Sequence, residues 1–328
     1  MEPNNPWDQK QTEQKTNPSK EWALIEKVML ASVQEQRRAR RWSIFFRILT
    51  FSYLLILLFL LKPTTLGPAA SIGPHAAVVE VTGLIAEGAE ASAENIIQGL
   101  AAAFEDKNTL GVILKINSPG GSAVQSDYVY QEIKRLRNQY PQIPVYAVIG
   151  DLGASGAYYI ASAADEIYAN RASILGSIGV VMSSFGLVEA IDKLGIERRL
   201  FTAGEHKGFM DPFSPIDATE REHVQQMLDL VHRQFIDRVK AGRGDRLIED
   251  ARLFSGLVWT GESAFELGLI DGMADSRELA RDLLQTEHLV DYTHKPSPFE
   301  RFAKQLGAGM GETLAGFWGL SGQDRINF

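Results

Sequence analysis

The sequence lacks cysteine altogether among its 328 residues. Disulfide bonds, thiolate metal sites and a cysteine nucleophile are therefore excluded. Histidine is also sparse, and its positions do not have the spacing of metal ligands. The six histidines are His75, His206, His223, His232, His288 and His294. We accordingly expect no metal ion and no other cofactor.

Positively charged residues are also fewer than negatively charged ones. The chain has 33 Lys and Arg against 41 Asp and Glu, a formal net charge of −8. Domains that bind nucleic acids are usually basic, so we expect no nucleic-acid partner. The charge is unevenly spread, because residues 1–62 carry ten Lys and Arg against six Asp and Glu, whereas the remainder carries 23 against 35. A basic N-terminal segment thus precedes an acidic body.

One long apolar run lies in the basic segment. Residues 44–61 contain a single charge, Arg47. At about 1.5 Å per residue, a helix of this length spans roughly 27 Å, close to the hydrocarbon thickness of a bilayer. Four arginines precede the run, Arg37, Arg38, Arg40 and Arg41. By the positive-inside rule they place the N-terminus in the cytoplasm, so we predict a single-pass anchor at residues 42–62 in the inner (plasma) membrane.

Two other interpretations of the apolar run are a cleaved signal peptide and a buried core helix. Residues 68–71, Pro-Ala-Ala-Ser, resemble a small-residue cleavage site. However, the polar region before the run is about forty residues long, which exceeds the length of a usual signal peptide. The length of the run and its flanking charge therefore favour an uncleaved anchor.

The anchor separates a polar N-terminal part from a large body. Residues 1–20 have too few apolar side chains to fold, whereas residues 22–33 have the apolar spacing of a short amphipathic helix. The predicted organisation is a cytoplasmic extension at 1–41, the anchor at 42–62, a linker at 63–75, an extracytoplasmic α/β domain at 76–300 and a Gly-rich tail at 301–328.

Short apolar runs alternate with amphipathic segments of helical length in the first part of the body. The predicted strands are 76–81, 110–116, 145–149, 166–169, 177–182 and 196–201. The predicted helices are 92–106, 124–138, 187–194 and 219–241, the first with Ser92 as its N-cap. This alternation indicates an α/β body with parallel strand pairing. The part after residue 241 is expected to be mixed and mostly helical.

The stretch 150–161 follows the predicted strand 145–149 and leads into a run of small residues. Ser155 lies at this strand–helix junction between Ala154 and Gly156. A nucleophilic serine needs such a place, because a substrate carbonyl has to approach closely. Serine is also a preferred helix N-cap, so the stretch alone leaves both roles open. The two roles are compatible, since a helix N-terminus favours negative charge.

The turn 117–122 follows the predicted strand 110–116 and contains Gly120 and Gly121. Glycines allow backbone N–H groups to point into a cleft without a nearby Cβ atom. Such donors stabilise the oxyanion of an acyl-transfer reaction. An ordinary turn is the alternative interpretation, and a phosphate-binding loop is disfavoured because the Gly-Lys-Ser/Thr ending is absent.

A serine nucleophile needs a base, and two candidates lie in the Gly- and Pro-rich loop 202–215. They are His206 and Lys207. A lysine serves as a base only when it is neutral, which requires its pKa to fall from about 10.4 toward roughly 7 through burial. Such a shift corresponds to roughly 4 kcal/mol, so a catalytic lysine has to be well shielded from water.

Five short motifs of the body occur in the order and spacing of a known family. They lie at residues 116–122, 153–161, 176–180, 204–208 and 268–271. Each motif is weak alone, but five in order at compatible spacing are specific. Over residues 76–275 the chain resembles the signal peptide peptidase A family, S49-type membrane-anchored serine proteases with a Ser/Lys dyad. With one copy of each motif it resembles the short form rather than the tandem-duplicated form.

The resemblance implies a role for each matching residue. Ser155 is implied as the nucleophile and Lys207 as the general base. Gly120 or Gly121, together with a backbone N–H near Ser155, is implied to form the oxyanion hole. Ser177 matches a hydroxyl position that orients the lysine ammonium.

The resemblance also implies a fold, an assembly and a substrate class. The implied fold is a ClpP/crotonase-like spiral of β-β-α units. Similar proteins assemble into homo-oligomeric rings, in which subunits are able to share active sites. The implied substrates are cleaved signal peptides left in the membrane and other unfolded apolar peptides.

Three alternatives stay open beside the Ser155/Lys207 peptidase. One keeps the protease and uses His206 as the base, as in a Ser-His-Asp triad. Another is a crotonase-like acyl-CoA enzyme, which an extracytoplasmic body disfavours because coenzyme A is cytosolic. The third is a non-catalytic membrane scaffold that keeps the fold.

Overall fold

The computed structural model of the protein describes residues 18–60 and 73–295. The chain divides into two compact units, Met1–Thr65 and Leu66–Phe328. The first unit contains one continuous helix, α1 (Pro18–Leu60), which includes the helix predicted at 22–33. The apolar side chains of α1 between Ile44 and Leu57 are exposed within this unit.

The predicted membrane anchor begins within α1. In the described parts of the chain, no helix combines the length and the apolar content needed to cross a membrane. The anchor at 42–62 ends outside the described residues and stays a prediction. Most of the predicted linker and the whole predicted tail, 301–328, also lie outside them.

The second unit is an α/β body. Its strands are β1 (His75–Thr82), β2 (Thr109–Ser118), β3 (Val145–Ala154), β4 (Glu166–Ala169), β5 (Ile174–Gly176), β6 (Val258–Thr260), β7 (Gly272–Met273) and β8 (Leu289–Asp291). Its helices are α2 (Ala93–Glu105), α3 (Ala123–Gln139), α4 (Gly156–Ala161), α5 (Val188–Lys193), α6 (Ala218–Arg243), the short 3-10 helix η1 (Gly244–Arg246), α7 (Gly261–Glu266) and α8 (Ser276–Asp282).

The eight strands form one sheet in which β6, β5, β3, β2, β1 and β8 follow one another. All pairs are parallel except β5 with β6. β3 pairs with β4 along its first half and with β5 along its last three residues. The mixed α/β class and the parallel pairing are confirmed. The finer prediction, a spiral of β-β-α units, stays a prediction.

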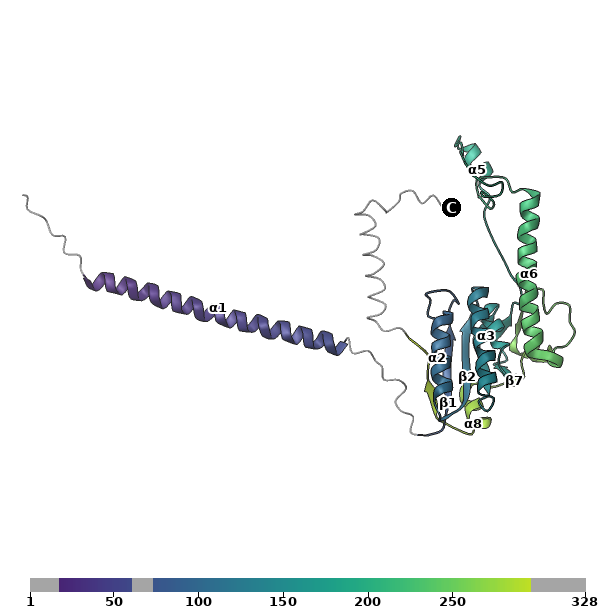
Figure 1. Ribbon diagram of the computed structural model, residues 1–328, viewed down its shortest axis with the longest axis horizontal. Helices are drawn as coiled ribbons and strands as arrows, with labels where there is room; N and C mark the ends of the chain where they lie inside the picture. The colour runs from purple at the N-terminus through teal and green to yellow at the C-terminus, as the bar shows by residue number, and fades with distance from the viewer. Residues whose placement is uncertain (1–17, 61–72, 296–328) are drawn as a thin grey trace, which may run out of the picture. The chain divides into compact units, whose positions relative to one another are not determined.

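Both faces of the sheet are buried, in keeping with the short continuous apolar runs of its strands. On β1, Ala77 and Val79 belong to the main core, whereas Ala76 and Val78 belong to a smaller core on the other face. The main core contains residues of α2, α3 and α4, and the smaller core contains residues of α8. Figure 1 shows α2 and α3 side by side over the strands.

The register places the carboxyl ends of three central strands together. Ser118 at the end of β2 pairs with Gly153, and Ala154 at the end of β3 pairs with Gly176 at the end of β5. The turn after β2, the junction after β3 and the segment after β5 therefore meet at one edge of the sheet. This edge is where ligands bind in open α/β sheets.

Two predicted strands are wrong. Regular pairing ends at Gly176, so residues 177–182 do not form a strand, and residues 196–201 have no regular secondary structure. Both runs have the apolar content of strands, but a strand also requires a partner strand, which neither run meets among the described residues. Val181 is 88% exposed and Phe201 is 91% exposed. After residue 241, the strands β6, β7 and β8 were not expected, because runs of two or three residues carry no periodic signal.

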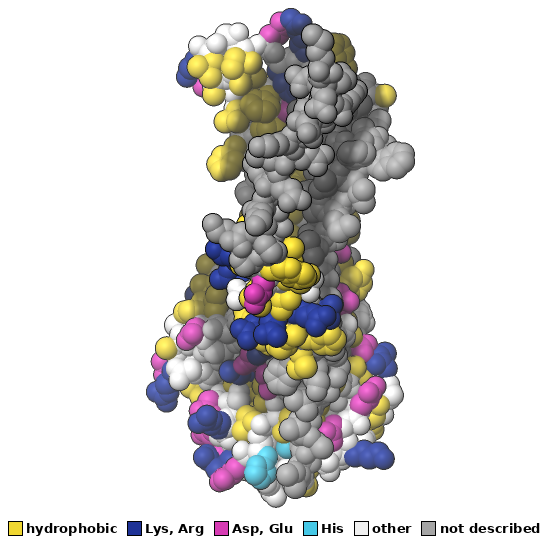
Figure 2. Space-filling model, turned by 90° about the vertical axis from the view of Figure 1, so that its left-hand side faces the viewer, with side chains coloured by type: hydrophobic (Ala, Val, Ile, Leu, Met, Phe, Trp, Pro, Cys, Tyr) yellow, Lys and Arg dark blue, Asp and Glu magenta, His cyan; other side chains and the backbone are white. Residues whose placement is uncertain are grey.

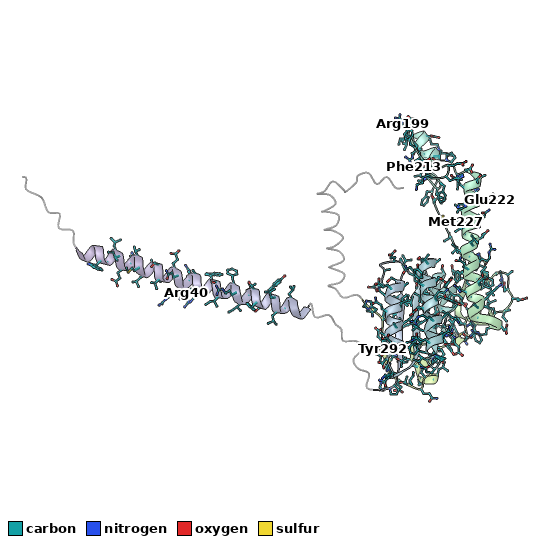
Figure 3. All side chains as sticks on the ribbon, in the orientation of Figure 1. Arg40, Arg199, Phe213, Glu222, Met227 and Tyr292 are labelled. Atoms are coloured by element: carbon teal, nitrogen blue, oxygen red, sulfur yellow. The ribbon has the colours of Figure 1, made fainter. Side chains whose placement is uncertain are left out.

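Residues 179–230, which we name the arm, contain α5 and the first half of α6. None of these residues is buried. Figure 1 shows α5 near the end of α6 that lies away from the strands, and Figure 2 shows apolar side chains gathered at that upper end. Arg199 and Phe213 lie at this far end, with Glu222 and Met227 on α6 below them (Figure 3). The second half of α6 packs on the body through the buried side chains of Phe235, Val239 and Arg243.

Candidate active site

Ser155 occupies a sharp turn between β3 and α4. Its φ of 54° and ψ of −124° form a backbone conformation that a non-glycine residue rarely adopts. The residue stands at the N-cap position of α4, yet its side chain makes no capping hydrogen bond. The hydroxyl is thus not used to begin the helix. A strained serine between a strand and a helix has the geometry of a nucleophile elbow.

The backbone of Ser155 is held on both sides. Its N–H donates to the carbonyl oxygen of Gly176 at 2.8 Å. Its carbonyl oxygen accepts a hydrogen bond from the N–H of Tyr159 at 3.0 Å. These two bonds connect the elbow to β5 and to the first turn of α4, and they maintain the strained conformation.

Gly120 lies directly against the elbow. A Cβ atom at this glycine would be 2.6 Å from the carbonyl oxygen of Ala154 and 2.8 Å from Cβ of Ser155. Its φ of 93° also favours glycine. The N–H of Gly120 donates to Oγ of Ser118 at 3.0 Å, so it is already engaged. Gly120 therefore allows the close approach to Ser155 without offering its N–H to a ligand.

Gly121 is the other glycine of the predicted turn, and its N–H donates no hydrogen bond among the described residues. A Cβ atom on Gly156 would lie 3.3 Å from the nitrogen of Gly121. Gly156 is the first residue of α4, and the first N–H groups of a helix have no partner within it. Two backbone donors therefore lie close together beside Ser155. The resemblance implied a backbone N–H near Ser155 as the second donor, and the structure identifies Gly156 as a candidate, since the residue after the nucleophile commonly supplies one.

Ser177 follows β5 and lines the same cavity as Ser155. Its φ is 50°, so it is a second serine in a strained backbone conformation. Its N–H donates to the carbonyl oxygen of Leu257 at 2.8 Å. The structure thus places Ser155, Gly121 and Ser177 around one cavity, and their roles stay predictions.

These residues lie in a groove with a cavity volume of about 1320 Å³. Its walls come from the first turns of α3, from the second half of α6 and from residues 254–256. Val124 and Tyr128 of α3 are more than half exposed along it. In the described parts of the chain, no group of three or more His, Asp and Glu residues is placed to hold a metal ion.

The two candidate bases predicted from the sequence lie elsewhere in this chain. Lys207 is exposed in the arm and does not line the groove. His206 is also exposed, and its Nδ1 lies 3.6 Å from a carboxylate oxygen of Glu220. Within one copy of the chain, neither residue is brought to Ser155.

His232 of α6 lines the groove, and sequence reasoning missed it. Its Nε2 lies 3.1 Å from the carbonyl oxygen of Ile178, so the ring donates a hydrogen bond to the segment that follows β5. No signal in the sequence distinguishes this residue, because it lies inside a long charged helix. Its position depends on how α6 packs against the body.

Comparisons with known proteins identify the family of this chain. The sequence profile of peptidase family S49 matches residues 137–290. A putative protease of Synechocystis sp. is 32% identical over 229 residues, which make up 68% of this chain and 80% of that protein. A putative signal peptide peptidase of Enterococcus faecium is 29% identical over 223 residues, 66% of this chain and 64% of that protein. The chain therefore belongs to peptidase family S49.

A relative of a different name has higher identity over a shorter stretch. A Brucella abortus protein named Na(+)/H(+) antiporter is 47% identical over 182 residues, which are 56% of this chain. The same stretch is 25% of that protein. The chain thus spans about a quarter of the length of this relative.

Proposed function

We propose that this protein is a serine peptidase that cleaves unfolded, apolar peptides with Ser155 as its nucleophile. The observation that carries the proposal is the strained elbow at Ser155 beside the N–H of Gly121, which makes no hydrogen bond in the described chain. Membership of peptidase family S49 supports the reaction class. The open groove around Ser155 supports a peptide substrate.

In the proposed reaction, Oγ of Ser155 attacks the carbonyl carbon of the scissile peptide bond and gives up its proton to the base. The negative charge that develops on the carbonyl oxygen is stabilised by the N–H groups of Gly121 and Gly156. The base then protonates the leaving amine, and the C–N bond breaks. Water hydrolyses the acyl-enzyme in the reverse sequence of proton transfers.

We assign the general base to Lys207 of a second copy of the chain. In one copy Lys207 is exposed and lies outside the groove. A lysine acts as a base only in its neutral form, which burial favours. The arm that carries Lys207 also exposes large apolar side chains, since Phe185 is 84% and Leu194 is 72% exposed. A ring in which each arm covers a neighbouring groove would bury both surfaces, and Ser177 would then orient the incoming amine.

The walls of the groove support the proposed substrate class. Val124 is 58% and Val181 is 88% exposed, so apolar side chains are available to a bound peptide. Residues 179–181 continue from β5 without a strand partner in the described chain. An extended peptide is able to pair with such a segment through its main chain. Remnant signal peptides combine the required extended form with apolar side chains.

The test is hydrolysis of an apolar fluorogenic peptide by the full-length protein in detergent. We expect Ser155→Ala and Lys207→Ala each to lower kcat by at least about 10³-fold, as loss of a nucleophile or its base does in serine proteases. His232→Gln should keep more than about a third of the activity. A glutamine retains a donor for the carbonyl oxygen of Ile178, so the substitution removes only the basicity of His232, which the proposed mechanism does not use. Equal rates for the wild type and Ser155→Ala would refute the peptidase.

Two further outcomes would reassign the base. Loss of activity in His232→Gln with full activity in Lys207→Ala would make His232 the base. Loss in a His206→Ala variant with full activity in Lys207→Ala would support the Ser-His alternative. A serine-reactive phosphonate probe that labels the wild type at Ser155 confirms that the hydroxyl is activated in each case.

Membrane attachment is proposed from the first unit. The exposed apolar side chains of α1, including Phe51 at 73% and Leu55 at 67%, require a cover, because a helix that is apolar on all sides is not stable in water. We expect residues 42–62 to keep the protein in the membrane pellet after extraction at alkaline pH. A variant that begins at residue 73 should be released. Release of the full-length protein would contradict the anchor.

A second candidate function is a non-catalytic domain that associates with a membrane transporter. The specific observation that favours it is the Brucella relative named as an antiporter, of which this chain matches a quarter. Absence of labelling at Ser155 by the phosphonate probe, together with co-purification of a transporter, would favour this candidate over the peptidase.

A further inference from the structure

A cluster of charged and aromatic side chains on the groove joins three helices through one carboxylate oxygen. Oδ1 of Asp127, on α3, accepts a hydrogen bond from the hydroxyl of Tyr159, on α4, at 2.8 Å. The same oxygen accepts a hydrogen bond from Nε of Arg238, on α6, at 3.3 Å, and a longer one from Gln131 at 3.5 Å. Oδ2 of Asp127 accepts none from the described residues. The peptidase mechanism uses no member of this cluster.

Asp127 and Tyr159 are connected to the two backbone donors of the oxyanion site. Tyr159 lies one turn after Ser155 in α4, and its N–H donates to the carbonyl oxygen of Ser155. Asp127 lies in the second turn of α3, which is capped by Ser122, the residue after Gly121. The hydrogen bond between Asp127 and Tyr159 therefore links the beginnings of α3 and α4.

The surroundings of this bond are rigid. Tyr159 is 5% exposed, and its ring lies 5.0 Å from the ring of Phe235 and 5.5 Å from that of Tyr130, measured between centroids. The guanidinium carbon of Arg238 lies 5.0 Å above the ring of Tyr130. Burial, together with donation to Asp127, raises the pKa of Tyr159 well above its ordinary value. The hydroxyl thus stays a donor over the whole pH range of an assay.

We propose that Asp127 is a positioning residue for the peptidase reaction, an inference that rests on the proposed role of Ser155. Through Tyr159, its carboxylate holds α3 and α4 at the separation that places the N–H groups of Gly121 and Gly156 around one oxyanion. Through Arg238, the same carboxylate holds α6 beside these two helices. Asp127 touches no reacting atom. A misplacement of about 1 Å at such a site costs on the order of 10²-fold in rate.

The proposal distinguishes three substitutions. Tyr159→Phe removes one hydroxyl and keeps the buried ring. Asp127→Ala removes the shared acceptor. Asp127→Asn keeps an oxygen that accepts from Tyr159 and Arg238, but it replaces Oδ2 by an amide nitrogen and removes the negative charge that pairs with Arg238. Tyr130→Phe is the matched control, because Tyr130 is equally buried and its hydroxyl makes only a 3.5 Å contact with the carbonyl oxygen of Arg238.

The experiment measures kcat and KM on the apolar fluorogenic peptide, and the inhibition constant of a peptide aldehyde that mimics the tetrahedral intermediate. We expect Tyr159→Phe and Asp127→Ala to lower kcat by about 30- to 100-fold while KM changes by less than about threefold. Aldehyde affinity should fall in parallel with kcat. Asp127→Asn and Tyr130→Phe should stay within about threefold of the wild type.

Wild-type kcat in both Tyr159→Phe and Asp127→Ala would overturn the proposal. So would a rise in KM at unchanged kcat, which would make Asp127 a substrate-binding residue. Full activity of Ser155→Ala refutes the proposed function instead, so the two failures are distinguishable. If Asp127→Ala does not fold, as judged by urea unfolding, Tyr159→Phe compared with Tyr130→Phe still decides.

Discussion

Gly121 has a φ of 152°, and a Cβ atom at this position would collide with the carbonyl group of Ile85. The same turn is fixed by hydrogen bonds from Ile85 N–H to Gly120 and from Ser122 N–H to Ile85. A side chain at residue 121 would therefore move the N–H that lies beside Ser155. At the residue scale, the site depends on a backbone conformation that only glycine adopts without strain.

We expect Gly121→Ala to lower kcat by about 10²-fold or more, because loss of one oxyanion donor costs about this much. Gly88→Ala is the matched control. Gly88 also has a positive φ, of 76°, but nothing lies within 4 Å of its added Cβ atom. We expect Gly88→Ala to lower the stability by about 1 kcal/mol through backbone strain and to leave kcat unchanged. An unchanged kcat in Gly121→Ala would show that the N–H of residue 121 does not stabilise the oxyanion.

At the element scale, the end of α6 is tied to the body by a buried ion pair. The side chain of Arg243 is 1% exposed, and its terminal nitrogens lie 2.6 and 3.1 Å from the carboxylate oxygens of Asp271. Its Nε donates to the carbonyl oxygen of Gly268 at 2.9 Å. Asp271 also accepts the N–H of Ile167, in β4, at 2.8 Å. This pair keeps the second half of α6, and with it the groove wall, against the sheet.

Arg243→Met leaves Asp271 with the more exposed Arg246, 3.1 Å from its Oδ1, as its remaining cation, so we expect the free energy of unfolding to fall by about 3 kcal/mol, the lower end of the cost of breaking a buried pair. Arg135→Met is the control, since Arg135 pairs with Glu132 on the exposed face of α3 and should cost less than about 1 kcal/mol. Urea unfolding at pH 7 measures both. Equal stability of the two variants would show that the buried pair does not hold α6.

The same pair predicts a pH dependence. Burial acts to raise the pKa of Asp271, but hydrogen bonds from Arg243 and from the N–H of Ile167 outweigh it and leave the pKa below its ordinary value. The carboxylate therefore stabilises the fold at pH values above the pKa of an unfolded Asp, about 3.9, and this contribution is lost as pH falls through the folded pKa. In urea unfolding, the stability difference between the wild type and Asp271→Asn should shrink from pH 7 to pH 3. A constant difference would contradict the assignment.

At the scale of the whole molecule, a single chain leaves apolar side chains of the arm exposed and the groove without a base. The arm exposes Phe201 and Phe185, whereas the groove contains Ser155 without either predicted base. Assembly of several copies would cover the apolar side chains and bring Lys207 to a neighbouring Ser155. This is the physical argument for a shared site.

A mixing experiment tests the shared site. Inactive Ser155→Ala and Lys207→Ala proteins, dissociated and reassembled together, should regain up to about a quarter of wild-type activity, because random cyclic assembly pairs an intact serine with an intact lysine at that frequency. Reassembly of either variant alone is the control. Mixed oligomers, seen by mass photometry, that stay inactive would contradict sharing between subunits.

Local sequence patterns were sufficient to predict several features of the site. Periodicity and turn residues identified β1 to β3, α2, α3 and α5, and the capping role of Ser92 is confirmed by its bond from the N–H of Asn95. Ser155 at a strand–helix junction and the two glycines after β2 were predicted for the same reason. Strand, turn and cap preferences act over a few residues, so a single sequence contains them.

Other features of the site depend on contacts between residues that lie far apart in the chain, and only the tertiary structure shows them. Hydrogen bonding to Ser118 engages the N–H of Gly120 and leaves that of Gly121 available, and packing of α6 brings His232 and Arg238 to the groove. The same packing leaves Lys207 outside it. The predicted strands at 177–182 and 196–201 failed because a strand exists only with a partner. These outcomes depend on strand register and helix packing, which local patterns do not encode.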